Sequence, residues 1–341
     1  MTGIDRRHLL QASLATAGSG LTMPALIRGA AAQPLTKVKY LTPFGFILGF
    51  TEVLYGKSGG FYVKQGLDLE VEGGRGSAMA VQQVSAGNAL VSRTGGTDLI
   101  KAYAKEPSMV AVGECFQKNI FYVMSHADKP IKSPTDMAGK KIGVVSTGGA
   151  TENLLDMMLV SKDVPISAVP REVVGNAPGA FEFVKLGRID AFIATNDTFF
   201  ALQSDKAPVY GFSADDFAPS PGQVYMVSKK TLDPQMENLA KFLRGTQAAI
   251  GDMIAKKANL LPVIESMVKD FDIAETKRPD KGVGILANAM PGTFEPVFRD
   301  KFASKPGPWE TAYDLMVKAK IIQPLNDRGF YDDKARKLAF G

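Results

Sequence analysis

The stretch Leu67–Lys105, LDLEVEGGRGSAMAVQQVSAGNALVSRTGGTDLIKAYAK, predicts a strand, a glycine loop and a helix, and then the same three elements again. Apolar and acidic residues alternate over Leu67–Glu72, which is the period of a half-buried strand. Gly73–Gly76 end this strand, and Ser77 stands where a helix N-cap belongs. Two helix N-termini therefore meet at one edge of a sheet, outside the carboxyl ends of its strands, where open α/β sheets hold ligands.

The same pattern returns later in the chain. Lys141–Val145 predicts a strand, Ser146–Thr151 is a loop of glycines and hydroxyls, and a helix follows from Glu152. Free amide groups at a helix N-terminus suit an anionic or electron-rich group, although each terminus contributes only about 0.3–2 kcal/mol. Between the two patterns lies the Pro- and Ser-containing segment Lys129–Asp136, which predicts a lobe boundary. We therefore expect an α/β protein of two lobes with a ligand cleft between them.

Residues 1–32 predict an export signal rather than a folded element. Asp5-Arg6-Arg7-His8-Leu9-Leu10 resembles the twin-arginine signature, and Ala30-Ala31-Ala32 supplies the small residues of a cleavage site. Gln11 and Pro24 interrupt the apolar region, which leaves no run of about 18 residues for a membrane anchor. We expect export to the periplasm by the twin-arginine route.

Composition excludes several functional classes. The chain of 341 residues carries a net charge of only +5, and beyond the leader no Lys/Arg cluster exceeds a pair, so we expect no nucleic-acid partner. Cys115 is the only cysteine, and His126 is the only histidine beyond the leader. A histidine-based triad or a multi-histidine metal site is thereby nearly excluded. We expect no metal, no cofactor and a monomer.

Four motifs resemble type II periplasmic solute-binding proteins of ABC importers, in the branch that holds sulfonate and taurine binders and binders of thiamine pyrimidine precursors (NMT1/THI5-like). Two of them, in the first half of the chain, are Gly60–Asp68 (GFYVKQGLD) and Gly74–Ala78 with Val81–Val84. The other two are Ile131–Val144 (IKSPTDMAGKKIGV) and Gly187–Ala191 (GRIDA).

The resemblance implies the two-lobed type II periplasmic binding protein fold, with mainly parallel sheets flanked by helices. Residues 33–128 and 223–341 would build lobe 1, and residues 129–222 would form lobe 2. Ile120–Ser125 and Gln223–Ser228 would be the two hinge crossings. The partners would be a small-molecule ligand and the membrane permease of an ABC importer.

The resemblance also implies which loops contact the ligand. The expected residues are Phe44, Phe46, Arg75, Gly76, Ser77, Arg93, Thr94, Gly95, Ser146, Thr147, Gly148, Gly149, Ala150, Asn196 and Asp197. Several have structural alternatives. Phe44 and Phe46 could be core residues rather than stacking platforms, Arg93 could be salt-bridged rather than bound to an oxyanion, and Asp197 could cap its own helix.

Aromatic residues near the expected cleft, Phe44, Phe46, Phe199 and Phe200, favour a planar nitrogen-containing or aromatic ligand similar to a thiamine pyrimidine precursor. Asp197 would repel a sulfonate at short range, but an alkanesulfonate, taurine or nitrate-like anion stays open as the alternative.

Two further functions are weighed against solute binding. A fungal pyrimidine synthase shares the fold and uses a histidine and cysteines. Phe50 lies near where that histidine would fall and Cys115 stands alone, so we expect no enzyme. A receptor that presents its ligand to a membrane sensor is the remaining alternative.

Overall fold

The computed structural model describes residues 34–43 and 45–341. The predicted export signal and Phe44 lie outside the described residues, so both stay predictions. Within the described part, no helix is both long enough and apolar enough to cross a membrane.

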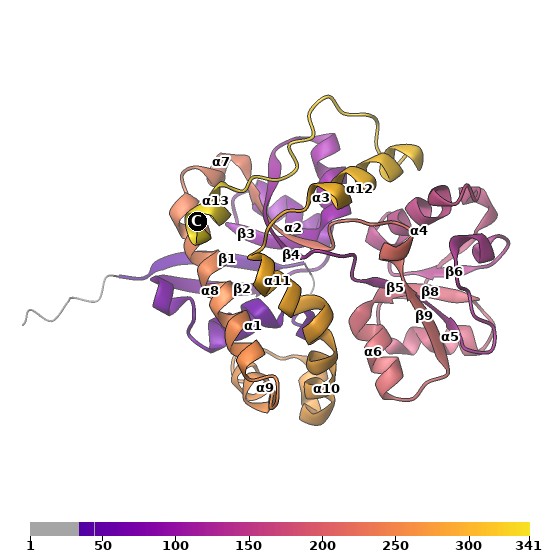
Figure 1. Ribbon diagram of the computed structural model, residues 1–341, viewed down its shortest axis with the longest axis horizontal. Helices are drawn as coiled ribbons and strands as arrows, with labels where there is room; N and C mark the ends of the chain where they lie inside the picture. The colour runs from indigo at the N-terminus through magenta and orange to yellow at the C-terminus, as the bar shows by residue number, and fades with distance from the viewer. Residues whose placement is uncertain (1–33, 44) are drawn as a thin grey trace, which may run out of the picture. The chain divides into compact units, whose positions relative to one another are not determined.

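The first sheet has the strand order β2-β1-β3-β10-β4 (Figure 1). β1 runs parallel to β2 and β3, whereas β10 is antiparallel to β3 and β4. The predicted strand in the opening stretch is confirmed as β2. The strands span Thr36–Thr42 (β1), Leu67–Gly73 (β2), Val91–Gly95 (β3), Met109–Phe116 (β4) and Gln223–Ser228 (β10).

Helices from both ends of the described chain belong to the same lobe as this sheet. The N-terminal set is α1 (Thr51–Ser58), α2 (Ser77–Ser85) and α3 (Gly96–Lys105). The C-terminal set is α7 (Lys229–Leu232), α8 (Met236–Ala255), α9 (Leu261–Met267), α10 (Pro279–Ala289), α11 (Glu295–Asp300), α12 (Pro306–Lys318) and α13 (Lys334–Phe340).

The second sheet has the order β7-β6-β8-β5-β9 and is built from the middle of the chain. β6 is parallel to β7 and β8, and β5 is antiparallel to β8 and β9. Its elements are β5 (Phe121–His126), β6 (Ile142–Val144), α4 (Ala150–Ser161), β7 (Arg171–Val173), α5 (Phe181–Lys185), β8 (Ala191–Thr195), α6 (Asn196–Ser204) and β9 (Val209–Ser213).

The chain passes between the sheets at positions other than the expected ones. Ile120–Ser125 and Gln223–Ser228 were expected as crossings, but β5 pairs along its length inside the second sheet and β10 inside the first. The crossings are instead residues 117–120 and 214–222. We therefore propose that the lobe boundary falls between β4 and β5 rather than at residue 129.

The two crossings lie against each other. The Gly222 amide donates to the Phe116 carbonyl (3.0 Å), and the Asn119 side-chain amide donates to Ser220 Oγ (3.0 Å). A Cβ built on Gly222 would lie only 1.7 Å from the Lys118 carbonyl oxygen. Only glycine therefore fits where the crossings meet.

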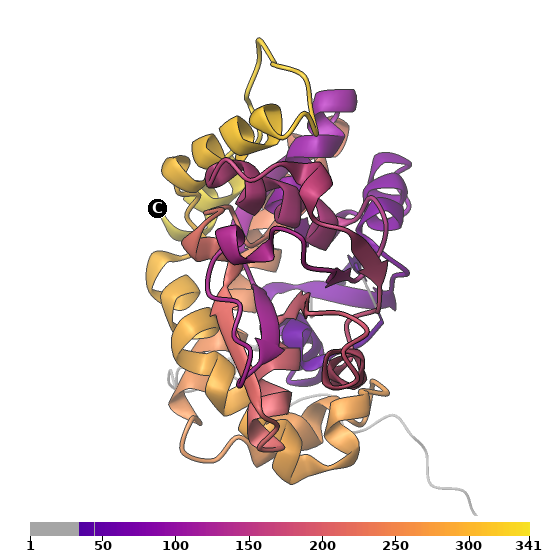
Figure 2. The ribbon, with the colours of Figure 1, turned by 90° about the vertical axis from the view of Figure 1, so that its right-hand side faces the viewer.

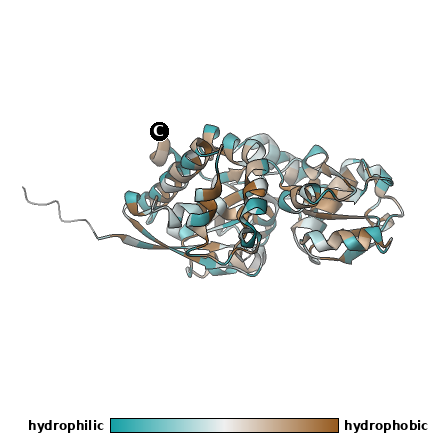
Figure 3. Ribbon diagram, turned by 90° about the horizontal axis from the view of Figure 1, so that it is seen from below, coloured by the Kyte–Doolittle hydropathy of each residue, from teal (hydrophilic) through white to brown (hydrophobic). Residues whose placement is uncertain are grey.

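Amphipathic helices bury apolar faces against the sheets, and Figure 3 shows hydrophilic and hydrophobic stretches alternating along them. α8 buries Leu239, Phe242, Leu243 and Ile250 at helical spacing. Tyr40 of β1 stacks on Phe242, with ring centroids 5.7 Å apart. Full burial of one such apolar side chain stabilises the fold by about 1.5–3 kcal/mol.

α12 links the two lobes through an apolar seam. Leu154 and Leu155 of α4 share one hydrophobic cluster with Trp309 and Tyr313 of α12, and the two helices lie side by side (Figure 1 and Figure 2). Because these side chains are buried, separating α12 from α4 would expose apolar area to water.

A buried carboxylate anchors the start of α12 to β4. Glu114 Oε1 accepts hydrogen bonds from Trp309 Nε1 (2.5 Å) and from the Lys305 amide (3.0 Å), while its Oε2 is buried without a partner. Burial raises the pKa of Glu114 to about 7, and the bonds from Lys305 and Trp309 offset part of this rise. The pKa therefore lies above its ordinary value of 4.5, so the protonated form favours the fold, and this contribution is lost as the pH rises from about 4.5 to 7.

We expect the fluorescence of Trp309, the only tryptophan, to titrate with a midpoint near pH 7, because its indole N–H bonds the titrating carboxyl. Glu114→Gln keeps an oxygen acceptor and removes the titrating proton, so the transition should vanish while the fold is kept. A transition that persists unchanged in Glu114→Gln would contradict this assignment.

Candidate functional site

A small cavity lies where α6 of lobe 2 meets loops and helices of lobe 1. Its volume of about 10 Å³ is about what one water molecule needs. The walls come from η1 (Leu48–Phe50), the end of β4, the first turn of α6, α10, and a π-helical turn that continues α10. The lining residues are Leu48, Gly49, Phe116, Asn196, Asp197, Ile285, Leu286, Ala289, Thr293 and Phe294.

Asn196 and Asp197 enter the cavity because β8 ends at its rim. The Asn196 amide donates to the Ile120 carbonyl (2.7 Å) of a crossing, and Asn196 Oδ1 accepts from the Asp197 amide (3.0 Å). On the facing side, a Cβ on Gly49 would lie 3.2 Å from Asp197 Oδ2. The absence of a side chain at Gly49 lets this loop approach the carboxylate.

Two carboxylates share this region. The pKa of Asp197 is raised to about 6, chiefly by burial and also by the neighbouring Glu275 carboxylate, while the charge of Arg93 acts in the opposite direction. Burial also raises the pKa of Glu275, whose Oε2 is buried without a hydrogen-bond partner. Among the described residues neither carboxylate forms an ion pair. A hydrogen-bond donor or a cation bound beside them would therefore stabilise their charged forms.

Several helix N-termini near the expected site carry carboxylates of their own, although α2 has none in its first turn. Glu52, Asp98, Glu152 and Asp197 occupy the first turns of α1, α3, α4 and α6. The Gly148 amide donates to Glu152 Oε2 (2.5 Å). At these four helices the positive end therefore lies next to a carboxylate of the chain itself.

The glycine loops expected to contact the ligand make contacts within the protein. Lys101 Nζ donates to the Gly148 carbonyl (3.1 Å) and to Asn153 Oδ1 (3.3 Å). Burial raises the pKa of Asp98 to about 6, and a hydrogen bond from Ser77 and the charge of Lys101 oppose this rise. Ser146, Thr147 and Gly148 are exposed, Gly149 and Ala150 are half-buried, and none of them lines the cavity.

Arg93 lies beneath the cavity rather than in its wall. It is only 1% exposed, and its Nη1 donates to Glu52 Oε1 (2.8 Å) and to the Gly49 carbonyl (2.6 Å). Thr94 and Gly95 are buried beside it in β3. The salt-bridged alternative for Arg93 is the one that the structure shows.

The remaining expected residues divide between surface and core. Arg75 is exposed, and Gly76, with φ 129°, allows the turn before α2. The Phe46 ring packs on Phe271 (4.9 Å between centroids). Phe199 and Phe200 lie against Tyr122 in the core of lobe 2. None of these aromatic rings lines the cavity.

The aromatic rings of the cavity are instead Phe116 and Phe294, with centroids 5.9 Å apart and ring planes at 80°. The sequence did not single them out, because Phe116 ends an apolar strand and Phe294 lies in a helical segment far along the chain. Gly49 and Glu275 were also missed as site residues. Only the position of Gly49 in the apolar loop after β1 hinted at a role.

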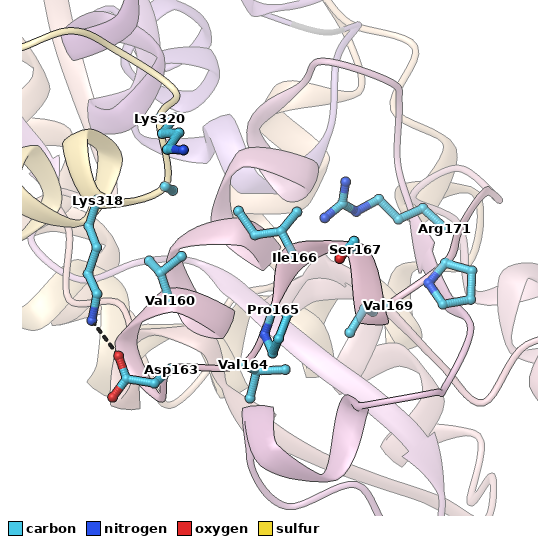
Figure 4. Close-up of a pocket in the computed structure, with 12 residues that line it drawn as sticks. Val160, Asp163, Val164, Pro165, Ile166, Ser167, Val169, Arg171, Lys318 and Lys320 are labelled. Atoms are coloured by element: carbon cyan, nitrogen blue, oxygen red, sulfur yellow. Dashed lines mark hydrogen bonds and ion pairs between the residues drawn. The ribbon is translucent and has the colours of Figure 1, made fainter.

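A larger hollow lies on the surface between α4 and the end of α12, with a volume of about 760 Å³ (Figure 4). Lys318 Nζ pairs with Asp163 Oδ1 (2.9 Å) at its rim. Its lining is mostly aliphatic and includes none of the expected site residues. We therefore place the candidate site at the small cavity, where buried polar groups converge.

Comparisons with known proteins agree with this architecture. No curated protein matches the sequence. A protein from Bordetella bronchiseptica RB50 superimposes with a TM-score of 0.69 at 16% identity, covering 89% of this chain and 96% of that one. The alkanesulfonate-binding protein SsuA from Xanthomonas axonopodis pv. citri, bound to MOPS, gives 0.61 at 13% identity, with 86% and 96% covered.

The periplasmic aliphatic sulphonate binding protein SsuA from Escherichia coli gives a TM-score of 0.59 at 15% identity, with 88% and 91% covered. These likenesses show the two-lobed periplasmic binding protein fold. The model of the family described as "NMT1/THI5 like" matches residues 48–259, which is more than half of the sequence. The chain therefore belongs to the NMT1/THI5-like family.

Proposed function

We propose that this protein is the periplasmic solute-binding component of an ABC importer and that its ligand is a small planar nitrogen-containing solute. Family membership and the two-lobed fold support solute binding. One observation carries the ligand class: Asp197 brings a carboxylate to a largely apolar cavity, and the nearby Glu275, outside the lining, raises its pKa, while neither group forms an ion pair within the described residues.

The lining favours a flat ring with N–H groups at one end. Phe116 and Phe294 offer aromatic surface, and the carboxylate of Asp197 accepts hydrogen bonds from a ring N–H or an amino group. Such a charge-assisted bond contributes about 1.5–3 kcal/mol. A sulfonate or nitrate would meet like charge there, which is unfavourable in a site from which water is excluded.

Binding requires movement of the lobes. The cavity volume of about 10 Å³ gives room for no more than about one water molecule, so a ring can enter only when lobe 2 swings away from lobe 1 and then closes over the ligand. The loaded, closed form would be the one that the membrane permease accepts. We propose that the protein acts as a monomer, exported by its twin-arginine-type signal, and that it releases its ligand chemically unchanged.

Calorimetric titration tests this function. We expect the hydroxymethylpyrimidine precursor of thiamine to bind with a Kd of about 1 μM or tighter, equivalent to about −8 kcal/mol, and taurine and nitrate to bind at least 100-fold more weakly. Affinity should fall as the pH drops below about 6, because Asp197, with a pKa of about 6, then takes up a proton and loses its charge.

Three outcomes would count against the proposal. Tight binding of taurine with no response to the pyrimidine would establish the anion alternative. Mass spectrometry of the eluted ligand should return the mass that was added, and a converted product would instead establish an enzyme. Absence of binding across pyrimidines, sulfonates and nitrate would remove the proposed ligand class altogether.

A further inference from the structure

Arg93 is the centre of a buried polar network in lobe 1. Its Nη1 bonds Glu52 Oε1 and the Gly49 carbonyl, and its Nε donates to Gln223 Oε1 (3.1 Å). The guanidinium is held between two rings, 4.0 Å from the centroid of Phe116 and 4.8 Å from that of Phe50. Each side of this cation is thus fixed by a different segment of the chain.

These partners occupy three mechanically important positions. Phe116 is the last residue of β4, from which the first crossing leaves, and Gln223 is the first residue of β10, at which the second crossing returns. Gly49 lines the cavity and approaches Asp197 of lobe 2. One side chain therefore touches both hinge ends and one wall of the cavity.

The stability of the fold alone does not explain why a charged residue occupies position 93. Burial by itself lowers the pKa of Arg93, but the Glu52 carboxylate together with smaller contributions from Cys115 and neighbouring tyrosines outweighs burial, so the pKa lies above its ordinary value. Glu52 is held in turn by Tyr225, whose hydroxyl donates to Glu52 Oε1 (3.1 Å). Buried ion pairs are often no more stabilising than apolar replacements of similar volume. The multiple directed bonds of the guanidinium fork, in contrast, fix geometry that apolar packing would not.

We propose that Arg93 is a positioning residue that couples the cavity wall at Gly49 to both hinge crossings, so that hinge rotation and the shape of the ligand cavity change together. This inference rests on the proposed function, since it concerns a binding protein that closes on its ligand. Arg93 acts through Gly49, Phe116 and Gln223 and has no assigned ligand contact.

The test measures the distance between the two lobes in the absence of any ligand. Spin labels at Lys185 of lobe 2 and Lys230 of lobe 1, both exposed, report the distance distribution between the lobes in a Cys115→Ala background. Three variants are compared: Arg93→Met, Arg93→Lys and the double variant Arg93→Met with Glu52→Gln. We expect a broadened distance distribution in all three, with Arg93→Lys the closest to the parent.

Thermal unfolding separates positioning from stability. Arg93→Met leaves the Glu52 carboxylate buried without its ion-pair partner, so the Tm of this variant should drop by about 5–10 °C. The double variant removes both charges and should recover most of that loss, yet its distance distribution should stay broad. Recovery of both Tm and a narrow distribution in the double variant would show a merely structural role and overturn the proposal.

An unchanged distribution in Arg93→Met would also overturn it. Because no ligand enters these measurements, their outcome is independent of the titrations that test the proposed function. Even if the protein binds none of the solutes tested, the distances between the spin labels still decide whether Arg93 couples the hinge to the cavity.

Discussion

Asp197→Asn is expected to raise the melting temperature of the protein at pH 7.5 while weakening ligand binding at least tenfold. The pKa of Asp197 lies at about 6 against an ordinary value of 3.8, so the protonated carboxyl favours the fold, and this contribution is lost as the pH rises from about 3.8 to 6. Above pH 6 the ionised group is unfavourable by about 1–2 kcal/mol once its partial exposure is allowed for. Asparagine removes that charge.

The same substitution removes the acceptor on which the ligand depends. Loss of one charge-assisted hydrogen bond corresponds to about 10- to 100-fold in Kd. Unfolding curves at pH 5 and pH 7.5 should show the gain in Tm only at the higher pH, and titration with the pyrimidine should show the loss of affinity at pH 7.5. Stabilisation without loss of affinity would remove Asp197 from the site.

Asp98→Asn is the matched control. The pKa of Asp98 is also raised to about 6 by burial, but Asp98 lies outside the cavity lining. We expect a similar gain in Tm with an affinity close to that of the parent. If Asp98→Asn abolishes binding and Asp197→Asn does not, the ligand lies on the glycine loops near Ser77 rather than in the cavity.

Gly222→Ala is expected to lower the free energy of unfolding by about 3 kcal/mol or more and to lower Tm by on the order of 10 °C. The new Cβ would lie 1.7 Å from the Lys118 carbonyl oxygen and 3.0 Å from that of Phe116. Both obstacles are backbone atoms, and the Gly222 amide already bonds the Phe116 carbonyl (3.0 Å). The crossings can accept the methyl group only by moving apart.

Separated crossings should also prevent full closure of the lobes. Small-angle scattering with saturating pyrimidine should show compaction in the parent and little in Gly222→Ala. Gly284→Ala in α10 is the control, because no side chain or other segment lies within 4 Å of a Cβ there and alanine is favoured over glycine in a helix by about 0.5–1 kcal/mol. Unchanged Tm and compaction in Gly222→Ala would contradict the close approach of the crossings.

Local patterns in the sequence were sufficient for much of the fold. The alternation over Leu67–Glu72 records which side chains face the core, and Gly76 and Gly148, with φ of 129° and 67°, mark turns that other residues rarely adopt. Strand partners are not encoded in this way. The apolar sequence of β5 fits a strand that crosses between the lobes as well as a strand inside one sheet. Only its pairing with β8 and β9 places it in the second sheet.

The site was less predictable for the same physical reason. Asp197 could be proposed from its place at the start of a helix, but its neighbour Glu275 comes from a separate segment that no motif marks. Arg93 is followed in the sequence by Thr and Gly residues that are typical of a loop. It can be buried because it forms an ion pair with Glu52 of α1. A charge and its partner are brought together only by tertiary packing, which the sequence near either one does not report.

The apolar seam between α12 and α4 holds the two lobes together more strongly on one side of the interlobe region than on the other. On the opposite side α10 meets α6, where Lys281 Nζ pairs with Asp205 Oδ2 (2.9 Å) and the side chains are 23% and 50% exposed. A solvated pair of this kind contributes at most about 1 kcal/mol, less than the full burial of a single leucine side chain of the seam. We therefore expect the lobes to separate on the side of α10 and α6 while α12 stays packed on α4. A solute would then enter and leave past Lys281 and Asp205.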